Sequence, residues 1–297
     1  IATGSIIPML IYGSDNVLKG DVIFWLALVM GVAGFIAFQW MIRNTTIRVD
    51  TSIQLNEDAP KFNFFKAIAN FVRNRAALGC TLAAFFSMCC MYAGSTATSI
   101  VWQAYFKNAQ ISGAMGLITL FPMILFIPFT RKITEKWGKK EGASFGLVFS
   151  MLACTLMLII PIPANGTGIA IYMLLQLMNG LGQGIAMCVG NAMMADAIDY
   201  HEWKTGKREE GMTYALHSFF RKLVQGIGPS ICLVLMVMLG YDEALGAAQP
   251  DAVAANMRYL VAGIYFVGSI IMFVGTKFIY NLDKKTLEQM QKELGRG

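Results

Sequence analysis

Seven stretches of this 297-residue chain are apolar over about 20 residues each, the length at which a helix crosses a bilayer. These stretches constrain the fold more than any other feature of the sequence. They predict an all-α integral membrane protein with seven full transmembrane helices, at residues 22–42, 78–106, 112–130, 143–161, 169–194, 213–240 and 257–279.

The composition agrees with this interpretation. Hydrophobic residues make up 56% of the chain and charged residues only 14%, which argues against soluble, disordered and nucleic-acid-binding proteins. The bilayer is therefore the expected partner, and no nucleic acid is expected. The six cysteines lie in apolar stretches with no CxxC or Cys/His spacing, so they indicate neither a zinc site nor a disulfide framework.

The start of the sequence is also informative. Residues 1–12 are apolar but too short to span a bilayer, and they end at the turn-like Gly13-Ser14-Asp15-Asn16. The chain opens on Ile1 without a basic segment before the apolar run, which argues against a signal peptide. We expect this stub to be the end of a helix whose beginning lies upstream, in a larger protein.

The basic residues segregate between alternate loops. Nineteen of the 24 lysines and arginines lie in segments 43–75 and 131–142, in the loop after 194 and in the tail. The other loops hold only Lys19, Lys107 and Arg258, together with several acids. By the positive-inside rule the nineteen-charge side is cytoplasmic, which predicts a multi-pass protein of the inner (cytoplasmic) membrane with a cytoplasmic C-terminus.

The longest connection divides the chain. Segment 43–75 is basic and aromatic in its second half, a pattern typical of an amphipathic helix on the membrane surface. Six helices follow it, and one helix and the stub precede it, as expected for the later part of a twelve-helix transporter of two halves. We therefore assign 1–42 to the end of an N-terminal bundle, 43–75 to a cytoplasmic middle loop, 76–280 to a C-terminal six-helix bundle and 281–297 to a cytoplasmic tail.

The helix over 213–240 has one polar face. At 100° per residue its polar side chains, including His217, Ser218, Arg221 and Lys222, fall within an arc of about 140°. Lys222 lies roughly 14 Å into the helix, near the middle of the bilayer, where a cation marks a functional site. Arg221 either snorkels or pairs with a neighbouring acid, and His217 is either a hydrogen-bonded core residue or a proton carrier.

The helix over 169–194 repeats the pattern with amides and glycines. Such residues most often let neighbouring helices approach and form hydrogen bonds, yet Gln183 and Asn191 can also bind sugar hydroxyls. Aromatic residues near the outer end of the span over 78–106, Tyr105 among them, can stack on a sugar ring or belong to the interfacial belt.

The loop over 194–211 is dense in acids and bases. Its spacing is not that of HExxH, and no second ligand cluster accompanies it, so a metal site is not expected. Ion pairs at the cytoplasmic mouth that form in one conformation and break in the other are the favoured interpretation. The candidate gate residues are Asp196, Asp199, Glu202, Lys204, Arg208 and Arg221. The cytoplasmic segments contain no P-loop or nucleophile motif, so the chain is not expected to be an enzyme.

The stretch ADAIDYHEWKTGKREEGMTYALHSFFRKL at residues 195–223 resembles the signature of the glycoside-pentoside-hexuronide:cation symporters, a branch of the major facilitator superfamily. The segment RKITEKWGKK at 131–140 resembles the superfamily's loop between helices eight and nine. The resemblance implies a major-facilitator fold covering the end of helix 5 to helix 12. The first four helices and most of the fifth would then precede this sequence.

The resemblance also implies roles for single residues. Lys222 matches the helix-eleven lysine that lies near the sugar and cation sites of the family's melibiose carriers, and Ser218 matches a neighbouring hydroxyl. His217 stands where those carriers have a glutamine, and Met187 where they have a tryptophan. The family's cation-binding acids lie on early helices, so the coupling ion, Na⁺ or H⁺, would bind outside this chain, and no other cofactor is implied.

The favoured hypothesis is secondary active transport of a glycoside, pentoside or hexuronide, coupled to a cation by alternating access. Substrate-binding candidates are Lys222, Ser218, His217, Asn191, Gln183 and Tyr105. Two alternatives remain open: a membrane sugar sensor or scaffold that does not transport, and a carrier of lipid-like amphiphiles. The amide-rich faces argue against the lipid carrier.

Overall fold

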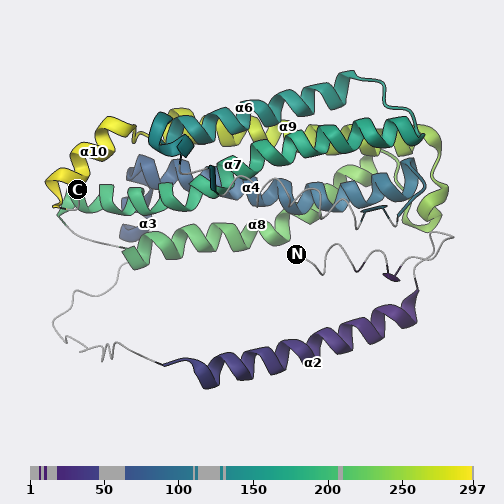
Figure 1. Ribbon diagram of the computed structural model, residues 1–297, viewed down its shortest axis with the longest axis horizontal. Coiled ribbons are helices and arrows are strands. Elements are labelled where there is room, and N and C mark those ends of the chain that lie inside the picture. Colours follow the sequence, from purple (N-terminus) through teal and green to yellow (C-terminus); the bar gives the residue numbers. More distant parts are fainter. Residues whose placement is uncertain are drawn as a thin grey trace.

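The computed structural model describes residues 7, 10–11, 19–46, 64–109, 111–112, 128–129, 132–206 and 210–295, and within these ranges it contains helices and no strand (Figure 1). The helices are α2 (Gly20–Asn44), α3 (Phe64–Arg73), α4 (Arg75–Ile100), α6 (Lys139–Ile159), α7 (Gly166–Thr205), α8 (Glu210–Met238), α9 (Asp251–Val274) and α10 (Lys284–Glu293). The π-helical turns η1 (Val101–Tyr105) and η3 (Gly275–Ile279) extend α4 and α9, and a short 3₁₀ segment, η2 (Glu243–Ala248), precedes α9.

Six of these helices are long and apolar enough to cross a membrane: α2, α4 with η1, α6, α7, α8, and α9 with η3. They confirm six of the seven predicted spans. The seventh, over 112–130, and the stub over 1–12 lie almost entirely outside the described residues.

Capping interactions set the ends of α7 beyond its apolar part. Asn165 precedes the helix, and its side-chain oxygen accepts a hydrogen bond from the backbone N–H of Gly168 (2.9 Å). The helix ends at Gly206, whose left-handed φ of 68° favours glycine. The prediction of a loop from 194 onward was therefore wrong as far as Thr205, because hydropathy marks only the apolar part of a helix.

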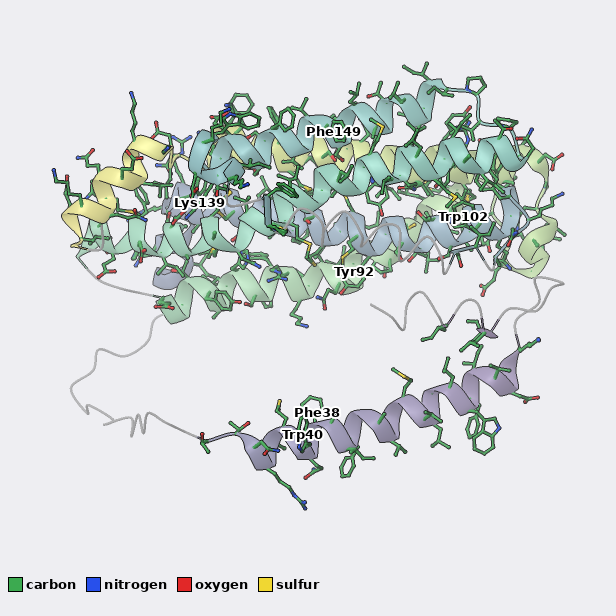
Figure 2. All side chains as sticks on the ribbon, viewed as in Figure 1. Phe38, Trp40, Tyr92, Trp102, Lys139 and Phe149 are labelled. Atoms are coloured by element: carbon green, nitrogen blue, oxygen red, sulfur yellow. The ribbon has the colours of Figure 1, made fainter. Side chains whose placement is uncertain are left out.

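The helices run up and down between two ends. At one end, Arg75 at the start of α4 donates to the Phe278 carbonyl of η3 (3.3 Å), and Lys284 of α10 donates to the Glu135 carbonyl just before α6 (2.7 Å). Trp203 near the end of α7 donates to Glu293 of α10. Most basic residues of the described part lie here, so we call it the basic end. Figure 2 shows Lys139 at this end and Trp102 at the opposite, far end.

The far end holds a buried aromatic cluster and a buried cation. Trp102 is fully buried between Phe106 and Tyr172. Arg258 is 3% exposed and donates to the carbonyls of Met157 (3.0 Å) and Ile160 at the end of α6. The sequence placed Arg258 in an outer loop, but α9 begins seven residues earlier, at Asp251, and carries it into the bundle.

The two helices that flank the bundle differ in their packing. None of the residues of α2 is buried, and this helix lies apart from the others (Figure 1). Its Phe38 and Trp40, labelled in Figure 2, are exposed. α3 lies within the predicted middle loop, and its Ile68 and Phe71 pack on the core of the basic end. Its apolar face therefore contacts protein at these two positions, and its contact with the membrane surface stays a prediction.

Midway between the two ends, a cluster of hydrogen-bonded polar side chains, here called the polar seam, joins α6, α7 and α9. The backbones of α6 and α7 are in close contact at the same level. Ser150 donates to Asn179 (2.6 Å), and Gln183 donates to Ser269 (2.9 Å) and more weakly to Ser150 (3.3 Å). Gly182 makes the approach possible: a β-carbon there would overlap the Gly146 carbonyl oxygen and lie 2.7 Å from the Ser150 nitrogen. The polar seam gives these side chains hydrogen-bond partners, which lipid tails cannot provide.

Replacing Gly182 by Ala should lower the free energy of unfolding by about 1–3 kcal/mol, because the methyl group pushes α6 away from α7. The matched control is Gly263→Ala on α9, where a β-carbon meets no atom within 4 Å. Thermal unfolding of the purified full-length protein in detergent measures both variants. Equal melting temperatures for the two would contradict the proposed backbone contact.

Candidate substrate cavity

The polar face of α8 begins with a buried histidine. His217 is 3% exposed, and its Nδ1 lies 2.9 Å from the Thr81 hydroxyl of α4, close enough for a hydrogen bond. This bond ties α8 to α4, the helix on which it mainly packs. Arg221 follows one turn later and is partly buried on the same face.

A cavity lies beside these two residues. Its volume is about 60 Å³, room for a few water molecules and far below the roughly 300 Å³ of a small-molecule site. Its polar lining comes from four segments, α4, α7, α8 and η3, and consists of Ser87, Asn191, His217, Arg221 and Thr276. Small side chains, among them Ala83, Ala84 and Ala186, leave the space.

The cavity reaches the surface of the described part of the chain through Asn191, which is exposed. Lys222 and Ser218 lie on the adjoining strip of α8 and do not line the cavity. Lys222 is exposed, and its ammonium group donates a long hydrogen bond to Gln225 (3.5 Å). The structure thus brings together His217, Asn191 and Arg221, with Ser218 and Lys222 beside them.

Two predicted substrate residues lie elsewhere. Gln183 belongs to the polar seam between α6, α7 and α9, where Ser150 and Ser269 accept its hydrogen bonds. Tyr105 lies at the far end, and its hydroxyl donates to the Ile162 carbonyl (2.5 Å) in the connection between α6 and α7. The geometry therefore gives these two residues structural partners, and their contact with substrate stays a prediction.

The candidate gate residues lie on two helices in the structure. Arg221 of α8 lines the cavity, and its role in a gate stays a prediction. Asp196, Asp199, Glu202 and Lys204 are all helical, on the last turns of α7, and Arg208 lies outside the described residues.

Asp196 pairs across helices with a residue outside the predicted set. The Lys139 ammonium of α6 donates to both carboxylate oxygens of Asp196, at 2.8 and 2.6 Å. A second pair joins Lys277 of η3 to Glu141 of α6 (2.5 Å). Lys139 lies in the basic segment that resembles the superfamily loop, and this resemblance is the signal that could have identified it.

Lys204, another candidate gate residue, contacts an aromatic ring, and its role in a gate stays a prediction. Its ammonium group lies 4.1 Å from the centroid of the Trp203 ring, a cation–π contact. The Trp203 ring N–H donates to Glu293 of α10 (2.7 Å). Hydrogen bonds from Gln289 and Trp203 lower the pKa of Glu293 from its ordinary value, so this contact is strongest while the carboxylate is ionised.

The charged residues at the cavity, Arg221 and the neighbouring Lys222, are both cations. Within the described part of the chain, no acid forms an ion pair with Arg221 or Lys222, and no cluster of three metal-binding side chains occurs. A cation within a bilayer normally faces an opposite charge, water or a ligand. The arrangement can therefore receive a polar or anionic group.

Several apolar helices around a polar, cationic cavity define a multi-pass membrane protein of the transporter class. The chain belongs to the MFS/sugar transport protein family, whose model it matches over residues 2–284. This match confirms the predicted all-helical major-facilitator fold and the predicted family of sugar symporters.

Its relatives are named as transporters. It is 25% identical over 99% of its length to the uncharacterized symporter YjmB of Bacillus subtilis and 26% identical over 89% to the glucuronide carrier protein homolog of Escherichia coli. It is also 23% identical over 95% of its length to the isoprimeverose transporter of Lactiplantibacillus pentosus. The chain spans 61%, 55% and 59%, respectively, of the lengths of these relatives.

Removing Lys139 should destabilise the basic end strongly. The side chain of Asp196 is 7% exposed, so Lys139→Ala leaves a buried charge unpaired and should lower the free energy of unfolding by about 3–5 kcal/mol. Lys277→Ala is the control, because its pair with Glu141 is half exposed and contributes about 1 kcal/mol or less. Equal thermal stability of the two variants would mean that another group balances Asp196.

Proposed function

We propose that this chain forms part of a symporter that carries a sugar across the cytoplasmic membrane, driven by a Na⁺ or H⁺ gradient. The observation that carries the proposal is the cationic cavity between α4, α7 and α8, with Arg221 inside it and Lys222 beside it. A membrane protein tolerates such charges where they act on a ligand or a coupling ion.

The substrate site extends beyond this cavity. A volume of about 60 Å³ cannot enclose a sugar, so the sugar must also contact the exposed side chains of Asn191 and Lys222 and the partly buried Ser218. In this proposal helices outside the described residues, from the other half of the transporter, close over that face and carry the site of the coupling cation.

Among the sugars considered, the charges favour a hexuronide. Arg221 presents a planar fork of donors that matches a carboxylate, and Lys222 adds a second positive charge close by. A relative named as a glucuronide carrier homolog supports the same choice. Neutral glycosides and pentosides offer hydroxyls alone and leave both cations without a counter-charge.

The basic end carries the gate in this proposal. Lys139 with Asp196 and Lys277 with Glu141 tie α6 to α7 and η3 within the six-helix bundle, so they hold this end of the bundle together. Rocking of the two halves would separate this end from the other half and expose the cavity to the cytoplasm. The density of basic residues at this end supports its assignment to the cytoplasm, together with the C-terminus.

The test is uptake by the full-length protein in proteoliposomes, with a radiolabelled glucuronide and the matching neutral glucoside. Wild-type uptake should require a Na⁺ or H⁺ gradient. Arg221→Gln should reduce kcat/KM for the glucuronide by about tenfold or more, with a small effect on the glucoside, because a charge-assisted hydrogen bond is lost. Lys222→Gln should act in the same direction.

Lys285→Gln is the control, since it removes a charge from the exposed start of α10, and its uptake should equal that of the wild type. An equal loss for both sugars would refute recognition of the carboxylate by Arg221. Normal uptake by both α8 variants would remove this face from the mechanism. Binding of sugar without accumulation would identify a sensor instead.

A further inference from the structure

A second cavity lies at the basic end, between α3 and the last turns of α7. Its volume is about 290 Å³, close to the lower limit of small-molecule sites. We call it the basic groove. Its lining consists of Asn70, Arg73, Asn74, Tyr200, His201, Lys204 and Thr205.

The lining of the basic groove has the composition of an anion site. Each of its side chains can donate a hydrogen bond, Arg73 and Lys204 carry fixed positive charges, and no acid is among them. Arg73 and Lys204 occupy the last turns of α3 and α7, positions at which the helix dipole favours cations. The two charged groups nevertheless border one common space.

The acids of α7 point away from the groove. At 100° per residue, Tyr200, His201, Lys204 and Thr205 fall within an arc of about 140° on the helix. Asp199 and Glu202 lie outside this arc, as does Trp203, which holds Glu293 of α10. By this periodicity the acids of α7 are directed away from the groove. Glu293 of α10 interacts electrostatically with Lys204 and offsets part of its charge, whereas Arg73 forms no ion pair within the described part of the chain.

The floor of the groove is rigid. Asn74, between α3 and α4, accepts a hydrogen bond from the Ala77 N–H (3.1 Å) and donates to the Ala197 carbonyl of α7 (2.9 Å). Phe71, two residues before Arg73, is buried in the core of the basic end. The helix α4, which is 26 residues long, also begins here, and the backbone amides of its first turn add partial positive charge. The distance between α3 and α7 is thus set before any ligand arrives.

We propose that the basic groove binds a phosphate group. Arg73 and Lys204 would neutralise its charge, and the amides of Asn70 and Asn74 and the phenol of Tyr200 would donate to its remaining oxygens. Two sources carry this chemistry: the headgroup of an anionic phospholipid at the membrane surface, and soluble phosphate. This site is separate from the substrate cavity, and its occupancy does not depend on the transported sugar.

The test compares two arms on the purified full-length protein. The first is equilibrium binding of radiolabelled inorganic phosphate in a neutral detergent. The second is the enrichment of phosphatidylglycerol over phosphatidylcholine around the protein in nanodiscs made of both lipids. Arg73→Gln combined with Lys204→Gln should weaken phosphate binding about tenfold or more, or abolish the lipid enrichment, because two charge-assisted contacts are lost.

Lys285→Gln combined with Lys292→Gln is the matched control, since it removes the same charge from α10 at the same end, outside the groove. Arg73→Lys combined with Lys204→Arg keeps the charge and should keep binding, which separates loss of charge from loss of folding. A loss confined to the lipid arm identifies a headgroup, and a loss in the phosphate arm identifies soluble phosphate. Wild-type behaviour of the Gln pair in both arms, or an equal loss in the control, would overturn the proposal.

Discussion

Polar groups inside a bilayer must find their partners within the protein, and this requirement organises the helix bundle. At mid-height α6, α7 and α9 satisfy it together through Ser150, Asn179, Gln183 and Ser269. The backbones of α6 and α7 come close because Gly182 lies against Gly146. This seam leaves α8 outside it, so α8 can present its own polar face to the cavity without competing for the same partners.

The basic residues of the described chain meet this requirement in different ways. Lys139 is paired with Asp196, and Arg258 binds the last carbonyls of α6 and stacks on Tyr259, 4.3 Å from the ring centroid. Both cations therefore have a structural explanation. Arg221 and Lys222 differ, because no described acid is paired with either of them. In the proposed function the transported ligand supplies their counter-charge.

The sequence predicted the transmembrane spans well because each helix carries its own hydropathy signal. The ends of α4, α6 and α8 lie within a few residues of the predicted ones. The end of α7 and the presence of α10 depend on caps and on contacts at the basic end, which a hydropathy pattern does not record. The partners of Tyr105 and Asp196 depend on which helices are neighbours. The sequence predicted an ion pair for Asp196, and for Tyr105 either stacking on a sugar ring or a place in the interfacial belt, but it could not identify Lys139 and the Ile162 carbonyl as their partners.

The candidate site shows how the two kinds of information combine. The 100° periodicity placed His217, Ser218, Arg221 and Lys222 on one face of α8, and packing then divided that face in two. Thr81 holds His217 toward α4, and Arg221 enters the cavity one turn later. The partly buried Ser218 and the exposed Lys222 lie outside the cavity. The contact with α4 thus positions His217 and Arg221. In the proposed function Ser218 and Lys222 face helices outside the described residues. A substrate held between two halves of a transporter needs this division, because it must touch a fixed wall and a wall that moves.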